Sequence, residues 1–464
     1  MQNLRDTLQD SQLDAMVVTE HDEIAWLFNL RGQGQSSNEG LMHSPLFESM
    51  ALISNDQVFL WIDTQKVVPG LMVHLNPRDC DQNNTCTVIG DISESLGDLE
   101  NWSQNYNKSI LLSTPSTYLT GASFAVYESI TNAHFQDSPI LIAKNVKNEA
   151  EAQGMINAHL RDAVALCQFS AHLEAEILQG SENWTELSAS KLLAEYRALQ
   201  KMYVEPSFTT IAAFGPNSAI IHYTPDLETD AKIDKSSLFL VDSGGQYYDG
   251  TTDVTRTFHY GTPTAHQIEM YTRVLMGAMD LALVIIPKNT QDGAIDLATR
   301  QHLFDKGLNF RHGTGHGIGA YLKVHEGPIN VHMHSGKEGR LTGSFAHNMF
   351  FSDEPGFYED GNFGIRLETI LRVVDVNLTS EPLATYGDFV RFEAVTLVPF
   401  EPRLIDFELM TTKQIEYFNT YNEKILNQVL PLVQDDRTRT WIETRTQYVS
   451  PAKSYEVQKW KNEI

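Results

Sequence analysis

The stretch that decides the fold is residues 238–257, LFLVDSGGQYYDGTTDVTRT. It opens with an apolar run at 238–241, which is typical of a buried strand, and Asp242 ends that run. A Gly-Gly pair then indicates a turn, and Asp253 follows Asp242 eleven residues later. We therefore expect the chain to fold back as a hairpin that brings these two carboxylates together near the centre of a sheet.

Three further polar residues stand in similar glycine-punctuated surroundings. His316 lies in HGTGHG (312–317), Glu354 opens Glu-Pro-Gly, and Glu368 follows Gly-Ile-Arg and precedes a β-rich run. Taken singly, each acid is more often a surface or capping residue. Together, four carboxylates and one imidazole at strand ends indicate divalent metal ions that prefer oxygen and imidazole ligands.

The charge of these ligands favours two metal ions over one. Ionised carboxylates held close together repel each other, so without cations some would have to be protonated. Two divalent ions would offset the charge of the four acids and leave room for one hydroxide between them, the arrangement that makes a nucleophile in two-metal hydrolases. We expect the ligands to be Asp242, Asp253, His316, Glu354 and Glu368.

Six strings of the sequence resemble those of the pita-bread metallopeptidases. They are 241–244, 249–257, 312–319, 324–328, 353–361 and 364–368. Within that family the chain is most similar to the cytosolic aminopeptidase P (Xaa-Pro aminopeptidase) branch, from about residue 10 to about residue 400. The long cytosolic forms carry one more domain in front, so the resemblance implies either a naturally short form or a shortened one.

The resemblance implies an α/β (α+β) fold with two domains. Alternating strand and helix signals predict a non-catalytic α/β domain over 1–143. A polar segment at 144–151 marks the boundary, and 144–464 is expected to form the pita-bread catalytic domain, a curved antiparallel sheet covered by helices. Within the first domain, strands are expected at 15–18, 51–54, 58–62 and 110–112, and Asp22 is expected near the cap of a helix.

Helix signals punctuate the catalytic domain. A long helix is predicted to end at about Leu178, and Thr185 is a plausible cap for the next one. Thr264 with Gln267 predicts a capping box for a later helix that Pro287 stops. In 344–352 the sequence departs from the family, which usually has a glycine there, and Asn348 is able to take the left-handed conformation in its place.

The resemblance also implies residues that contact the substrate. His222 and His325 are expected to line the pocket and stabilise the oxyanion or the leaving group, and His312 to hold the peptide or move a proton. Tyr358 and Arg366 match family positions near the site. We expect Arg366 to orient a metal ligand by ion pairing.

A mechanism follows as a hypothesis. Asp253 and Glu368 would bridge both metals, Asp242 would complete one coordination sphere, and His316 with Glu354 the other. A bridging hydroxide would attack the carbonyl of the first residue, and Glu354 would carry the water proton to the departing nitrogen.

The predicted enzyme is a metalloaminopeptidase that removes the N-terminal residue from peptides with proline in second position. Carboxylate-rich ligation with one imidazole suits two Mn2+ ions, although Zn2+ or Co2+ could occupy the site. One alternative is a prolidase, which cuts only Xaa-Pro dipeptides. Another is a non-catalytic pita-bread binding protein, a class that typically loses metal ligands, whereas this chain keeps all five.

Composition indicates the kinds of partner and the cellular compartment to expect. Its 464 residues include 34 Lys and Arg against 60 Asp and Glu, a net charge of −26 that argues against nucleic acid as a partner. The sequence has no apolar run long enough for a membrane span and no visible secretory signal. Three cysteines are what a reducing cytosol predicts; Cys167 suits a core, and Cys80 and Cys86 could pair under oxidation. A cytoplasmic protein is expected, and a homodimer by resemblance only.

Overall fold

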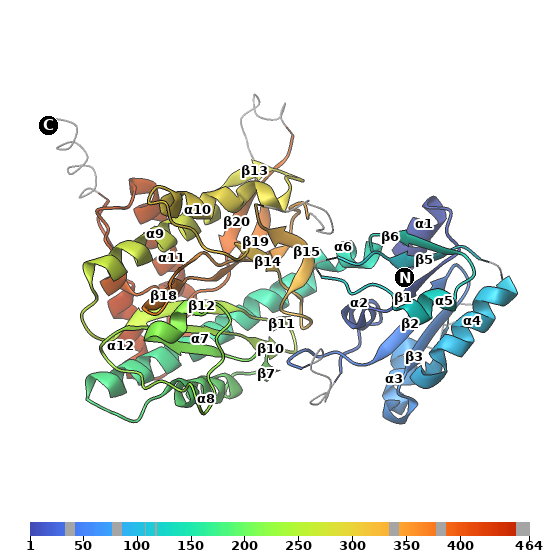
Figure 1. The fold of residues 1–464 in the computed structure, drawn as a ribbon, viewed down its shortest axis with the longest axis horizontal. Helices are drawn as coiled ribbons and strands as arrows, with labels where there is room; N and C mark the ends of the chain where they lie inside the picture. Colours follow the sequence, from blue (N-terminus) through green and yellow to red (C-terminus); the bar gives the residue numbers. More distant parts are fainter. Residues whose placement is uncertain are drawn as a thin grey trace. The chain divides into compact units, whose positions relative to one another are not determined.

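The computed structural model describes residues 1–464 except 33–41, 77–85, 107, 117, 334–342, 377–386 and 452–464. Contacts between Cα atoms divide the chain into two compact units, a first unit of Met1–Val146 and a second unit that begins at Lys147. Figure 1 labels the helices and strands of both units.

The first unit is a mixed six-stranded sheet with helices, in the strand order β4-β3-β2-β1-β5-β6 (Figure 1). Its strands are β1 (Ala15–Val18), β2 (Ser49–Ser54), β3 (Val58–Ile62), β4 (Thr87–Asp91), β5 (Ile110–Ser113) and β6 (Ala133–Gln136). Its α-helices are α1 (Gln2–Asp10), α2 (His21–Leu27), α3 (Pro69–Leu75), α4 (Ser95–Tyr106), α5 (Phe124–Glu128) and α6 (Pro139–Asn145).

The central strand β1 explains why this unit is layered. Successive side chains of a strand point to opposite faces, and here Met16 and Val18 join one apolar cluster while Ala15 and Val17 join another. Apolar cores therefore cover both faces of the sheet, as an α/β layer requires. The four strands predicted from the sequence are all present.

The helix expected at Asp22 is present. Helix α2 follows the N-cap residue Glu20, which makes no side-chain cap bond, and Asp22 lies in its first turn, near the cap as predicted. Asp22 lies inside the helix and is buried, and its Oδ2 is 2.9 Å from the Lys144 Nζ of α6. Apolar packing of α2 on the sheet and this ion pair place the side chain in the interior, which a local capping rule cannot foresee.

The second unit is built from antiparallel strands and long helices. Its strands are β7 (Tyr203–Pro206), β8 (Ile211–Phe214), β9 (Leu238–Ser243), β10 (Gly245–Tyr247), β11 (Gly250–Thr251), β12 (Val254–His259), β13 (Ile285–Pro287), β14 (Gly315–Gly317), β15 (Glu326–Val331), β16 (Phe350–Asp353), β17 (Gly356–Glu359), β18 (Phe363–Arg366), β19 (Thr369–Val376) and β20 (Phe389–Ala394). Its α-helices are α7 (Glu149–Leu178), α8 (Glu186–Ala198), α9 (Ala265–Ala282), α10 (Asp296–Phe304), α11 (Thr412–Gln428) and α12 (Asp436–Arg445).

Every described strand pair of the second unit is antiparallel. The largest sheet has the order β13-β20-β19-β16-β14-β15, and a second has the order β12-β9-β8. Helices α7 and α9 lie against the strands (Figure 1). The expected class, an α/β domain followed by an antiparallel sheet covered by helices, is confirmed.

The hairpin predicted from residues 238–257 is present. Strand β12 pairs with β9 so that Thr255 lies opposite Asp242, and Asp253 directly precedes β12. A glycine is needed at 244 because a Cβ there would stand 1.9 Å from the carbonyl oxygen of Thr252. The turn therefore brings the chain back closely enough for both carboxylates to reach one site.

Capping residues set the ends of the helices largely as predicted. Thr185 caps α8, and Thr264 with Gln267 forms the capping box of α9. Helix α9 ends at Ala282, however, and Pro287 lies beyond it in β13, so proline is not what stops this helix. Asn348 takes the left-handed conformation, with φ of 65°.

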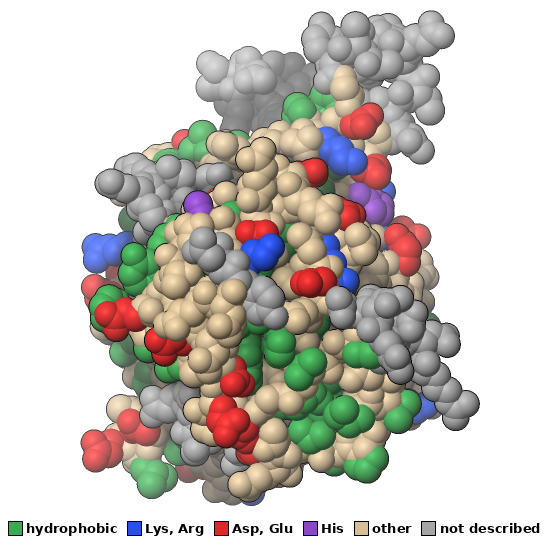
Figure 2. Space-filling model, turned by 90° about the vertical axis from the view of Figure 1, so that its right-hand side faces the viewer, with side chains coloured by type: hydrophobic (Ala, Val, Ile, Leu, Met, Phe, Trp, Pro, Cys, Tyr) green, Lys and Arg blue, Asp and Glu red, His purple; other side chains and the backbone are tan. Residues whose placement is uncertain are grey.

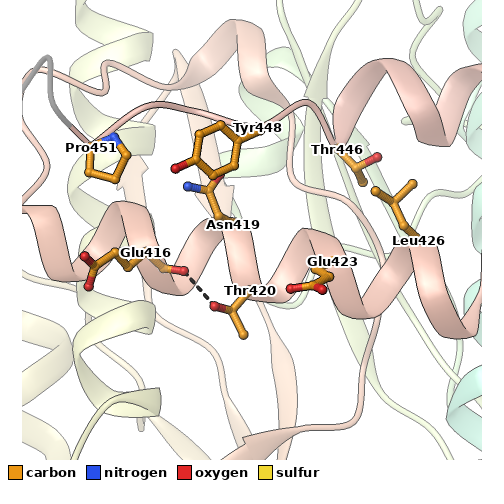
Figure 3. Close-up of a pocket in the computed structure, with 8 residues that line it drawn as sticks. All are labelled: Glu416, Asn419, Thr420, Glu423, Leu426, Thr446, Tyr448 and Pro451. Atoms are coloured by element: carbon orange, nitrogen blue, oxygen red, sulfur yellow. Dashed lines mark hydrogen bonds between the residues drawn. The ribbon is translucent and has the colours of Figure 1, made fainter.

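The surface of the molecule offers no single acidic patch on the face drawn in Figure 2, where Asp and Glu side chains are scattered among apolar and uncharged ones. A pocket of about 440 Å³ lies between α11 and the segment that ends at Pro451 (Figure 3). Its titratable lining groups are Glu416, Glu423 and Tyr448, without a described histidine, cysteine or lysine. We assign it no catalytic role.

Three further expectations concern Cys167, the Cys80–Cys86 pair and a membrane span. Cys167 is a free thiol, fully buried in the core of the second unit. The pair that Cys80 and Cys86 could form under oxidation involves Cys80, which lies outside the described residues. Among the helices that the structure describes, none combines the length and apolarity needed to cross a bilayer.

Candidate metal centre

The five residues singled out by the sequence lie in or directly beside antiparallel strands of the second unit. Asp242 is the fifth residue of β9 and Asp253 precedes β12. His316 is the middle residue of β14, Glu354 follows β16, and Glu368 stands between β18 and β19. Pairing of β14 with β16 and of β16 with β19 brings the last three to one place.

Ligand atoms of these residues fall into overlapping groups whose members lie within 4.8 Å of one another. One group contains Asp242, Asp253 and Glu368, and a second contains His316, Glu354 and Glu368. Glu368 belongs to both groups. Two adjacent cation positions that share a carboxylate are the geometry of a dinuclear metal site.

His316 is oriented as a metal ligand should be. Its Nδ1 is 3.0 Å from the carbonyl oxygen of Gly317, so this nitrogen carries the proton and donates it. The other nitrogen, Nε2, is left with a lone pair, 3.6 Å from Asp253 Oδ2 and 3.5 Å from Glu354 Oε1. Burial lowers the pKa of His316 well below its usual value, which keeps the imidazole neutral and able to bind a metal.

The carboxylates of the cluster repel one another strongly. Burial, followed by the charges of neighbouring acids, raises the pKa of Asp253 and of Glu368 well above their usual values. Burial also raises the pKa of Glu354 to about 8. Without a bound cation these three acids therefore favour the protonated form, and cations would restore them to the charged form.

Two neighbours orient individual ligands. Arg366 donates from Nη2 to Asp242 Oδ2 at 2.5 Å, a charge-assisted bond between buried side chains. The Thr255 hydroxyl donates to Glu368 Oε2 at 2.9 Å. Each bond fixes one carboxylate oxygen and leaves the other directed elsewhere.

Arg366, Tyr358 and His312 form a chain of hydrogen bonds beside the cluster. Arg366 Nη1 donates to the Tyr358 hydroxyl oxygen at 2.9 Å. His312 Nδ1 donates to the Gly313 carbonyl oxygen at 2.7 Å, so its Nε2 accepts from the Tyr358 hydroxyl at 2.9 Å. Burial, followed by the charge of Arg366, lowers the pKa of His312 to about 3. The imidazole is thus held neutral with a fixed tautomer.

His325 and His222 are placed differently. The His325 ring packs edge-on against His316, with 4.1 Å between ring centroids, and one of its nitrogens lies within the group that contains Asp253 and His316. His222 is exposed in a turn after Ile221, whose carbonyl oxygen accepts a 3.4 Å bond from Arg366. The structure therefore brings His325 into the cluster and leaves His222 at its exposed side.

The residues present fit a pair of divalent ions. Asp242 Oδ1 is buried and has no hydrogen-bond partner, although Oδ2 is bonded to Arg366. A buried carboxylate oxygen without a donor is costly unless a cation takes the donor's place. An oxygen-rich donor set with one imidazole is what divalent first-row metals bind.

Sequence reasoning missed several residues that shape the site. The Ser352 hydroxyl donates to Glu354 Oε1 at 3.1 Å and accepts from the His316 backbone N–H at 3.0 Å, which links two ligands. Asp353 is buried beside Glu354, and its Oδ1 has no hydrogen-bond partner. Ser352 and Asp353 stand just before the candidate ligand Glu354, and Asp353 opens the matching string 353–361. These were the signals available.

This fold and cluster place the chain among the metal-dependent hydrolases of pita-bread architecture. The profile of metallopeptidase family M24 matches residues 153–375. The Creatinase/Prolidase N-terminal domain matches 1–151, and the C-terminal region of peptidase M24 matches 388–449. The chain belongs to metallopeptidase family M24, within the branch of Xaa-Pro aminopeptidases to which the relatives below belong.

Two curated relatives illustrate that branch. Xaa-Pro aminopeptidase 1 of Dictyostelium discoideum is 40% identical over 452 residues, covering 96% of this chain and 68% of the relative. Aminopeptidase P2 of Arabidopsis thaliana is 35% identical over 467 residues, covering 96% of this chain and 63% of the relative. The chain thus spans about two thirds of the length of these relatives.

Solved structures agree with the sequence relatives. An X-prolyl aminopeptidase from Caenorhabditis elegans, described as a cytosolic enzyme with a di-nuclear active site, aligns with a TM-score of 0.86 at 31% identity and covers 97% of this chain and 70% of its own. A prolidase from Pyrococcus furiosus aligns with a TM-score of 0.59 at 18% identity, covering 84% of this chain and 98% of its own. At that identity the second likeness shows the fold alone.

Proposed function

We propose that the protein is a metalloaminopeptidase that removes the N-terminal residue from peptides with proline in second position. The observation that carries the proposal is the pair of ligand groups joined by Glu368, in a chain whose relatives are named Xaa-Pro aminopeptidases. Asp242, Asp253, His316 and Glu354 would complete the ligand set of the two ions.

Two divalent ions bound here would polarise the scissile carbonyl and lower the pKa of a water enough to make it a nucleophile. The chain's own contribution begins with orientation. Arg366 fixes Asp242, Thr255 fixes Glu368, and the Gly317 carbonyl fixes the His316 tautomer. Substitution of residues that hydrogen-bond to metal ligands commonly lowers metal affinity or activity by about 10- to 100-fold.

Glu354 is the residue we assign to proton transfer. A carboxylate oxygen can accept a proton from water, and the Ser352 hydroxyl holds one oxygen of Glu354 in place. Glu354 would accept the proton of the attacking water and release it to the proline nitrogen. That nitrogen is a poor leaving group until it is protonated, so the transfer is required for the C–N bond to break.

The histidines are assigned to the substrate. His325, packed against His316, and exposed His222 would contact the scissile carbonyl or the leaving group. His312 would contact the peptide from the other side, where Tyr358 and Arg366 hold its ring. Because His312 is neutral with Nε2 accepting from Tyr358, any role in proton movement passes through that hydroxyl.

Three finer points complete the proposal. Mn2+ is the metal we favour, because four carboxylates outnumber the single imidazole among the proposed ligands. A cytosolic location is proposed from the likeness to the Caenorhabditis elegans enzyme. A homodimer stays a prediction from the resemblance.

The test is a three-substrate assay on protein dialysed against chelator and then loaded with Mn2+. The substrates are an Xaa-Pro-Pro tripeptide, an Xaa-Pro dipeptide and an Xaa-Ala-Pro control. We expect release of the first residue from the Xaa-Pro-Pro tripeptide alone, no turnover in the chelated protein, and two metal ions per chain by elemental analysis.

Other results would redirect the assignment. Cleavage of the dipeptide alone would make the protein a prolidase. Silence on all three peptides with two metal ions bound would overturn the proposed activity and favour a binding role. If elemental analysis found no metal after incubation with Mn2+, the proposed ligand set would be overturned.

A further inference from the structure

A buried ion pair lies at the start of the second unit, which is the proposed catalytic unit. Lys147, the first residue of that unit, forms a salt bridge from Nζ to Glu326 Oε1, and the two side chains are 1% and 0% exposed. The backbone N–H of Lys147 also donates to the Asn348 carbonyl oxygen at 3.1 Å. A lysine this deeply buried is rare unless it is paired.

Glu326 is the first residue of β15, and it closes the segment 318–325, which we call the His325 loop. Glu326 lies opposite Gly317 in the β14–β15 pairing, so both ends of the loop are anchored at one point. The Glu326 carboxylate lies against the loop, because a Cβ on Gly319 would stand 3.1 Å from Glu326 Oε2. One carboxylate therefore connects Lys147 with the interior of the loop.

The His325 loop is held from its other side by neutral bonds. Gln246 Nε2 donates to the Leu322 carbonyl oxygen at 2.8 Å, and the Leu322 N–H donates to the Thr251 hydroxyl oxygen at 3.3 Å. His325 ends this loop with its ring against His316. A shift of the loop would consequently move the His325 ring relative to the metal ligands.

We propose that Lys147 is a positioning residue that acts through Glu326 to hold the His325 ring in its working place. The proposal rests on the proposed function, in which His325 contacts the substrate. Removing the Lys147 ammonium takes away the ion pair that fixes Glu326 Oε1, so the carboxylate can turn toward other donors or toward water. The His325 loop then shifts with Glu326, whereas Asp242 on β9 and Asp253 before β12 keep their places.

Kinetics of Lys147→Met in the Mn2+-loaded full chain test the role. We expect kcat on the Xaa-Pro-Pro tripeptide to fall about 10- to 100-fold, with KM within about threefold, because His325 acts on charge that develops during reaction. Lys147→Arg, which keeps a buried cation, should recover most of the loss. In a His325→Ala background the Lys147→Met change should have no further effect on kcat, since the two residues act as one unit.

Two further variants separate positioning from a loss of folding. The double variant Lys147→Met with Glu326→Gln removes both buried charges, so it should fold even if the single variant does not. Lys144→Met is the matched control, since Lys144 is equally buried and paired with Asp22 in the first unit. Lys144→Met should leave kcat unchanged.

A readout independent of activity is hydrogen exchange of the peptide covering 318–326. We expect its exchange rate to rise about tenfold in the double variant and not in Lys144→Met. Unchanged exchange, or equal kcat losses with and without His325, would overturn the positioning role. If the wild-type protein shows no Xaa-Pro cleavage while exchange rises as expected, the proposed function fails and the positioning of the loop stands.

Discussion

Acidic side chains are buried in both units of this chain, and the two clusters are balanced in different ways. In the first unit, Asp22 and Glu23 on α2 are 2% and 0% exposed, and Lys144 Nζ is 2.9 Å from Asp22. In the catalytic unit, four carboxylates share overlapping ligand groups, and Arg366 donates to one of them. The first cluster carries its own ammonium, whereas the second is built around more negative charge than its arginine offsets.

The difference teaches what each cluster is for. A buried acid paired with a lysine is a structural element, and its loss should appear in stability. A buried group of acids without enough cations is unstable as it stands, and it becomes favourable when dissolved metal ions bind. Substitutions in the catalytic cluster should therefore act mainly on turnover and metal binding, and those in the first unit mainly on unfolding.

The largest expected effect is on turnover, from Glu354→Gln. Glutamine keeps an oxygen near the metal position but cannot carry a proton, so kcat should fall by about 10³-fold or more, as for loss of a general acid–base group. In metal-free protein the midpoint of thermal unfolding should not fall, since a buried acid with a raised pKa is removed. Glu359→Gln, on a half-exposed side chain that pairs with His266, is the control. Turnover near the wild-type rate would remove Glu354 from the mechanism.

Lys144→Met should act on stability alone. It leaves Asp22 buried without its ammonium, which should lower the free energy of unfolding by about 3 kcal/mol. Urea unfolding followed by tryptophan fluorescence measures the change, and kcat per folded molecule should match wild type. A fall in kcat of tenfold or more would contradict the purely structural role of the Asp22–Lys144 pair.

Arg366→Met should weaken metal binding. Arg366 is the cation built into the catalytic cluster, and without it Asp242 loses its orienting bond. We expect the affinity for Mn2+ to fall by about 10- to 100-fold, or about 2 kcal/mol, as for other partners of metal ligands. Titration of metal-free protein, followed by isothermal calorimetry, gives the affinity. The Mn2+ affinity of Arg366→Lys should lie between those of the wild type and Arg366→Met, because lysine keeps the charge and loses the paired geometry.

Local signals in the sequence were enough for much of the fold. The apolar run before Asp242 and the Thr264–Gln267 capping box depend on neighbours in the chain, and the structure has both. Contacts between distant residues left no such signal. Lys147 pairs with Glu326 across 179 positions, and nothing beside Lys147 in the sequence distinguishes it from an ordinary charged linker residue. The same holds for the edge-on contact between His316 and His325, which depends on how β14 and β15 pair.

The candidate ligands were chosen from motifs, and their roles remain proposals because a set of motifs names residues without giving distances. The fold adds the tautomer of His316, fixed by the Gly317 carbonyl, and the oxygen of Asp242 that has no donor. Neither property is encoded locally. The first depends on where a backbone carbonyl lies, and the second on the lack of a donor near Asp242 Oδ1. Only the assembled strands create these surroundings.

The smallest expected effect comes from Glu23→Gln and depends on pH. Burial, followed by the charge of Asp22, raises the pKa of Glu23 from 4.5 to about 8. The folded state therefore holds its proton more tightly than the unfolded state, so stability is fully present below about pH 4.5 and is lost as pH rises toward 8. Glutamine is neutral throughout and removes this loss.

We expect Glu23→Gln to raise the free energy of unfolding by on the order of 1 kcal/mol at pH 8, because the cost of burying the amide offsets part of the gain. At pH 5 the change should be close to zero or slightly unfavourable. Urea unfolding at both pH values, with exposed Glu128→Gln as the control, measures the difference. A gain of equal size at pH 5 and pH 8 would show that the effect comes from packing, and would place Glu23 outside the charged cluster of the first unit.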